Sequence, residues 1–247
     1  MINEGEILFV TTTLYTKWLD YQKEIISNLF PNSQHIIIDG RNNWPNSWFN
    51  WINVVKKSNA IYYIHIDEDF FITDKQEILN CLLKMESENI DLLGCSDGYH
   101  HFRQHNPVAI NTFLMFGKVE HLKELNFDDI KFQWIGDSYI NNLDLKYREE
   151  YSIDFNYKHD KLCDCKFDNF EPYYAFLWKM KDMGLKFDYL YPHFDELFKS
   201  TNPRLNKYSN DIGIHMWYTR QWNNNMDVFG VPNIDRYNNL EKKILIK

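Results

Sequence analysis

Three consecutive acidic residues, Asp67, Glu68 and Asp69, are the strongest candidates for chemistry in this chain, because a run of aromatic and β-branched residues leads directly into them. That run, residues 61–66, predicts a buried strand. Side chains alternate between the two sides of an extended chain, so Asp67 and Asp69 should point one way and Glu68 the other. Two carboxylates on one side suit Mg²⁺ or Mn²⁺, and an ion held in this way keeps positions open for substrate phosphates. The spacing therefore predicts a site for a metal bound to a diphosphate.

The acidic run also fits a simpler interpretation, in which it forms a solvated turn before a helix whose N-cap is Asp74. Apolar residues on both sides of the run favour the metal site, since acidic groups beside a buried region are costly without a compensating charge. Both interpretations place the run at the end of a strand.

The elements that must position these acids alternate between strand and helix patterns. Strands are expected at 7–13, 34–38, 61–66 and 91–96, and helices at 17–30, 48–57 and 74–88. Such a series predicts an α/β fold with a mostly parallel sheet and helices on both faces, where ligands bind beyond the carboxyl ends of the strands. Polar residues fall at those ends, namely Thr11, Thr12, Thr13, Asp39 and the acidic run.

The second half of the chain is less regular. A strand and a short helix are expected at 111–117 and 119–125, and the stretch up to Asp168 reads as an insertion or an active-site flap. Asn169 and Pro172 then predict the start of a helix that ends at Gly184. Glu171 would lie in its first turn, where a carboxylate complements the helix dipole.

Charge and composition disfavour a nucleic-acid acceptor. Lys and Arg total 27 against 35 Asp and Glu, the formal net charge is −8, and no basic run occurs. The four cysteines are too few for a disulfide framework, so free thiols are expected. The sequence shows neither the pattern of a secretion signal nor an apolar segment of the roughly 20 residues that span a bilayer, so we expect a soluble, cytoplasmic protein.

Taken together, these features resemble GT-A fold glycosyltransferases of the Asp-x-Asp type, which use nucleotide-diphosphate sugars. The resemblance covers about residues 7–191 and rests on the Thr-ended strand, Asp39, Asp67, Asp69, the 111–117 strand, and the acid-led helix followed by Gly184 to Leu190. It implies a Rossmann-like sheet with an irregular C-terminal elaboration. It also implies a single catalytic domain over 1–247, with a nucleotide- and metal-binding half at 1–98 and an acceptor-binding half with the C-terminal segment at 99–247.

The resemblance assigns roles to particular residues. Asp67 and Asp69 would bind the metal and, through it, the donor diphosphate. The nucleotide would contact the ends of the first two strands, at Thr11, Thr12, Thr13 and Asp39. Glu171 matches the acid that serves as catalytic base or orients the acceptor, but Pro172 stands where the family has a second acid. Asp137 is therefore the alternative base, with Asp168 behind it.

The family also carries a C-terminal histidine as a further metal ligand, and His215 matches it at the end of a short apolar run. A neutral imidazole beside two carboxylates suits Mn²⁺ better than Mg²⁺. Arg220 follows in a position to meet phosphate. The segment 210–225 is expected either to close over the donor as a lid or to pack as an arm onto the sheet.

The function implied is a metal-dependent glycosyltransferase of the hexosyltransferase type. It would move a sugar from a nucleotide-diphosphate donor, a UDP-sugar, to a hydroxyl acceptor, a glycan, with inversion or retention left open. Four alternatives remain: a nucleotidyltransferase, a metal-dependent nuclease, glycosyl transfer to a modified nucleic-acid base, and a non-catalytic sugar-binding protein. The first lacks its usual Gly-rich basic loop after the first strand, and the second would need a basic cleft.

Overall fold

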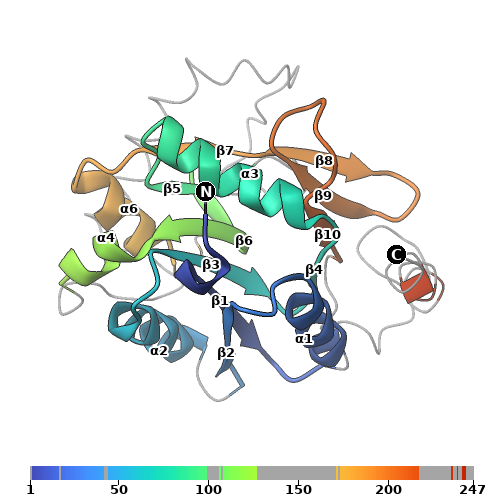
Figure 1. Cartoon of the computed structure of the whole chain (residues 1–247), viewed down its shortest axis with the longest axis horizontal. Helices are drawn as coiled ribbons and strands as arrows, with labels where there is room; N and C mark the ends of the chain where they lie inside the picture. Colours follow the sequence, from blue (N-terminus) through green and yellow to red (C-terminus); the bar gives the residue numbers. More distant parts are fainter. Residues whose placement is uncertain are drawn as a thin grey trace.

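The structure is a computed structural model with two sheets and the helices that pack on them (Figure 1). It describes residues 2–16, 18–41, 44–98, 106, 108–126, 171, 173–216, 235, 238, 241 and 242. The architecture is mixed α/β, with a mostly parallel central sheet between helices and a separate antiparallel sheet. The predicted fold class is therefore confirmed.

The central sheet has six strands in the order β2-β1-β3-β6-β5-β7. Their bounds are β1 (Ile7–Thr13), β2 (Gln34–Asp39), β3 (Tyr62–Asp67), β5 (Leu92–Ser96), β6 (Ile110–Lys118) and β7 (Phe187–Tyr189). Only β6 runs against its neighbours in this sheet. Thr13 pairs with Asp39 and Thr12 pairs with Asp67, so the carboxyl ends of β2, β1 and β3 lie side by side.

Helices cover both faces of this sheet. Their bounds are α1 (Trp18–Leu29), α2 (Trp44–Lys57), α3 (Lys75–Ser87), α4 (Val119–Glu124) and α6 (Tyr174–Asp182), with a 3-10 turn at Glu4–Glu6. Leu8 and Val10 of β1 pack in one core cluster with α2, α4 and α6, whereas Ile7 and Phe9 pack in another with α1 and α3. Burial on both faces explains why the first residues of β1 and β3 form apolar runs. None of the described helices is long and apolar enough to cross a membrane.

The second sheet orders its strands β4-β10-β9-β8, with bounds β4 (Phe70–Ile72), β8 (Tyr191–Asp195), β9 (Ser200–Arg204) and β10 (Gly213–His215). The chain leaves the central sheet at Asp67 and enters the second sheet at Phe70, so Glu68 and Asp69 form the turn between the sheets. A side chain at position 213 would come within 2.5 Å of the Phe71 carbonyl oxygen. Glycine there lets β10 pack closely against β4.

The predicted start of the late helix is wrong. Helix α6 begins at Tyr174 with Tyr173 as its N-cap, so Glu171 lies before the helix and not in its first turn. The hydroxyls of Tyr173 and Tyr174 donate to the buried carboxylate of Asp97, at 2.6 and 2.7 Å, and so connect the start of α6 to the end of β5. The predicted end is confirmed, because Gly184 has a φ of 82°. Asn169 and Pro172 lie outside the described residues.

Candidate metal centre

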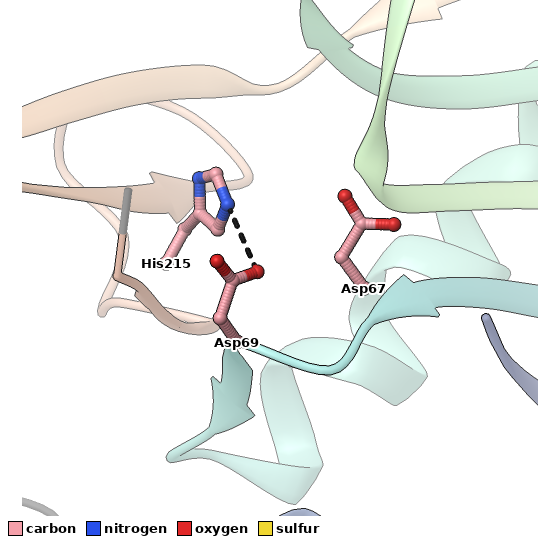
Figure 2. Close-up of side chains that lie close together, drawn as sticks. All are labelled: Asp67, Asp69 and His215. Carbon is pink, nitrogen blue, oxygen red and sulfur yellow. Dashed lines mark ion pairs between the residues drawn. The ribbon is translucent and has the colours of Figure 1, made fainter. Parts of the chain in front are cut away.

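Asp67, Asp69 and His215 come together at the carboxyl end of β3 (Figure 2). One ligand atom from each residue lies within 4.8 Å of the other two. Nε2 of His215 is 3.3 Å from Oδ1 of Asp69. Two carboxylate oxygens and one imidazole nitrogen are ligands that suit Mn²⁺, so the donor set fits the ion that the sequence implied.

Strand pairing and stacking bring His215 to this place. His215 pairs with Phe70 in the antiparallel β4·β10 ladder, next to Asp69, and the Met216 amide donates to the Asp69 carbonyl oxygen at 2.9 Å. The imidazole ring stacks on Phe113 of β6, with centroids 4.2 Å apart and planes 9° from parallel. The histidine is therefore 4% exposed and held by protein contacts on both its backbone and its ring.

The same pairing bears on the predicted lid. Strand β10 lies between β4 and β9, so the chain up to Met216 belongs to the second sheet. This placement agrees with an arm packed on a sheet, and closure of the segment 210–225 over the donor stays a prediction. Residues 217–225, including Arg220, lie outside the described part of the chain.

Glu68 is not part of the cluster of Asp67, Asp69 and His215, and it binds the loop after β1. Its carboxylate accepts hydrogen bonds from the Thr13 hydroxyl and from the amides of Leu14 and Thr16, the latter two at 3.2 Å each. The middle acid of the run thus anchors the loop after β1. Sequence reasoning gave Glu68 no role, although the opposite orientation expected for it was the available signal.

The hydroxyls of the three threonines make contacts inside the protein. Thr13 binds Glu68, Thr11 donates to Gln22 at 2.7 Å, and Thr12 lies 3.1 Å from Nε2 of His65. Nδ1 of His65 donates to the Thr112 carbonyl oxygen at 2.9 Å, so Nε2 accepts from Thr12. Burial lowers the pKa of His65 to about 4, which keeps this ring neutral. Contact of the threonines with a nucleotide stays a prediction.

Asp39 lies at the same edge and holds a cation that sequence reasoning missed. Arg41 donates to both of its carboxylate oxygens, with Nη2 2.6 Å from Oδ2, and these bonds lower the pKa of Asp39 to about 2. The guanidinium lies 4.3 Å from the ring centroid of Tyr15, which is 50% exposed. An exposed aromatic ring beside a fixed cation could hold a flat, anionic ligand. The local signal was an arginine two residues after a strand-ending aspartate.

The structure describes only the first of the three predicted bases. Glu171 is partly buried just before α6, while Asp137 and Asp168 lie outside the described residues. Trp48 stacks on Tyr173, two residues after Glu171, and also on His65, two residues before Asp67, with centroids 5.1 and 5.7 Å away. This aromatic stack links the start of α6 to β3, the strand that ends at Asp67.

Asp97 is a buried carboxylate that binds residues at the start of α6. Sequence reasoning did not select it. Besides the two tyrosine hydroxyls, it accepts a hydrogen bond from the Asn111 side-chain amide of β6. It is 1% exposed at the end of β5. Its bonds to β6 and α6 indicate that Asp97 supports the site structurally.

Comparisons with known proteins give similarity of structure but not of sequence. No protein-family model and no curated protein match the chain. Among solved structures, it is similar to A197 from STIV, with 15% identity and a TM-score of 0.41 over 54% of this chain and 74% of that one.

Two further similar structures are those of glycosyltransferases. A glycosyltransferase involved in the glycosylation of the major capsid of PBCV-1 has 10% identity and a TM-score of 0.42, over 74% of this chain and 80% of that one. The mannosyltransferase PcManGT from Pyrobaculum calidifontis, in complex with GDP-Man and Mn²⁺, has 10% identity and a TM-score of 0.35, over 49% and 46%. These values are too low to carry a function from those proteins to this one.

Proposed function

We propose that this protein is a metal-dependent glycosyltransferase that moves a sugar from a nucleotide-diphosphate donor, a UDP-sugar, to the hydroxyl group of a glycan. The observation that carries the proposal is the convergence of Asp67, Asp69 and His215 at the carboxyl ends of neighbouring parallel strands. Ligands of open α/β sheets bind at that edge. The Tyr15, Arg41 and Asp39 group lies at the ends of the adjacent strands β1 and β2.

In this proposal each described residue has a defined task. Asp67, Asp69 and His215 would hold Mn²⁺ or Mg²⁺, which when bound neutralises negative charge on the leaving diphosphate. Asp39 and the three threonines at the end of β1 would orient the nucleotide, and Arg220 would contact its phosphates. Glu171 would accept the proton of the acceptor hydroxyl as the new bond forms, with Asp137 as the alternative base.

A thermal-shift screen tests the proposal. Nucleoside diphosphates and their sugars are added with and without Mn²⁺, and we expect UDP compounds to raise the melting temperature only when Mn²⁺ is present, because ligands of the folded state stabilise it by mass action. Sugar release from the best donor is then measured. The absence of any Mn²⁺-dependent shift would contradict the proposal, and release of a nucleoside monophosphate with pyrophosphate would indicate a nucleotidyltransferase.

His215→Ala is expected to remove most of the stabilisation that Mn²⁺ and UDP add, because a metal ligand is lost. Losing a residue that only orients a ligand already weakens metal binding about 10–100-fold, so the loss here should be at least as large. The melting temperature without ligand should fall as well, since the ring stacks on Phe113 in the core. Phe113→Leu is the matched control, because it removes the stacking without removing a ligand atom. An unchanged ligand-induced shift in His215→Ala would show that His215 does not bind the metal.

A further inference from the structure

The buried side-chain amide of Gln22 binds both ends of the turn that carries Asp69. Gln22 of α1 is 1% exposed, and its Nε2 donates to the carbonyl oxygens of Asp67 and Phe70, at 2.6 and 2.9 Å. These carbonyls belong to the residues on either side of Glu68 and Asp69. Both N–H groups of the amide are therefore used on this one turn.

Thr11 and His35 fix the orientation of that amide. The Thr11 hydroxyl donates its proton to Oε1 of Gln22 at 2.7 Å, so the same hydroxyl accepts from Nε2 of His35 at 2.9 Å. Burial lowers the pKa of His35 to about 4, which keeps this ring neutral. A reversed amide would place an oxygen against two carbonyl oxygens. A chain of hydrogen bonds thus runs from His35 on β2 through Thr11 on β1 and Gln22 on α1 to the turn that carries Asp69.

The turn needs such a support because its two ends belong to different sheets. Asp67 ends β3 in the central sheet, and Phe70 begins β4 in the second sheet. On the second-sheet side, the Asp69 carbonyl oxygen accepts from the Met216 amide next to His215. The Gln22 amide binds both sides of the turn, and so ties the position of Asp67 to that of Asp69 and His215.

We propose that Gln22 is a positioning residue for the metal centre, and that Thr11 acts on this centre through Gln22. The consequence for metal binding rests on the proposed function, whereas the geometry of the turn does not. Partners that orient metal ligands typically contribute 10–100-fold to metal affinity. Gln22 would do this for two ligands at once, because it fixes the backbone from which both carboxylates project.

Gln22→Met tests this inference, because methionine is of similar length but cannot donate a hydrogen bond. We expect Mn²⁺ affinity, measured by EPR titration of the free ion, to fall about 10–100-fold. Hydrogen exchange at the Met216 amide should become faster, since that amide reports on the turn. Thr11→Val is the milder second variant and should change both readouts in the same direction.

Tyr62→Phe is the matched control. It removes a 2.8 Å hydrogen bond to Glu86 at the other end of β3, so it should lower the melting temperature without changing Mn²⁺ affinity or Met216 exchange.

The inference is overturned if Gln22→Met binds Mn²⁺ as tightly as Tyr62→Phe does. If the unaltered protein binds no Mn²⁺, the proposed function fails, and unchanged Met216 exchange in Gln22→Met then overturns the positioning role separately. If Gln22→Met does not fold, Thr11→Val decides the question by the same two readouts.

Discussion

Asp69→Asn is expected to abolish sugar transfer while leaving the fold intact. Asparagine has nearly the size and shape of aspartate, and the backbone bond from Met216 to the Asp69 carbonyl oxygen does not depend on the side chain. The carboxamide lacks the negative charge that a hard divalent ion requires. Nε2 of His215, which lies 3.3 Å from Oδ1 of Asp69, would also face an uncharged group. The expected cost therefore falls on metal and diphosphate binding, not on packing.

Circular dichroism, a Mn²⁺ titration and the turnover rate measured together test this prediction. Asp74→Asn is the matched control, because it makes the same chemical change at the N-cap of α3, where asparagine caps as well as aspartate. That variant should keep its turnover and its Mn²⁺ affinity. Retained turnover with tight Mn²⁺ binding in Asp69→Asn would contradict the assignment of the metal centre.

Glu171→Gln is expected to lower the turnover rate about 10²–10⁴-fold, the range for loss of a general base, while donor affinity changes little. Glutamine keeps the shape of the side chain but cannot accept the acceptor's proton. The motivation is that Glu171 lies two residues before Tyr173. Trp48 stacks on both Tyr173 and His65, and His65 is on β3, the strand that ends at Asp67. Turnover and the donor KM are measured in the same assay, and KM should change little.

Two variants keep this second prediction decisive. Glu196→Gln changes a surface glutamate that pairs with Lys199, outside the site, and should leave turnover unchanged. Asp137→Asn tests the alternative base. A comparable loss in Asp137→Asn, with none in Glu171→Gln, would move the role to Asp137.

Local rules were sufficient for the parts of the fold that depend on near neighbours in sequence. The apolar run before Asp67 predicted β3, and Asp74 was expected to cap the helix that it does cap, with its carboxylate accepting from the Gln76 amide at 2.8 Å. Gly184 marked the end of α6 for the same kind of reason, because few other residues adopt its positive φ. Each of these features depends on the backbone within a few residues.

Features that depend on pairing between distant segments were missed or misplaced. Strands β7, β8 and β9 are short and carry polar residues, so their pairing partners and not their own periodicity define them. The start of α6 was also misplaced, and the two tyrosines at its actual start bind Asp97, which follows β5 and is distant in sequence. How the chain divides between 1–98 and 99–247 stays a prediction, although β6 of the second part lies between β3 and β5 of the first.

In the candidate site, too, some features follow from the local sequence and others from the packing of distant segments. The sequence by itself determined that Asp67 and Asp69 lie at the end of a buried strand, because the apolar run that forms this strand is a local property. The tertiary structure decided that His215 meets them, since this required β10 to pair with β4 and its ring to stack on Phe113. It also decided that Gln22 holds the turn, because hydrogen bonds between side chains and carbonyl groups of separate elements depend on how those elements pack.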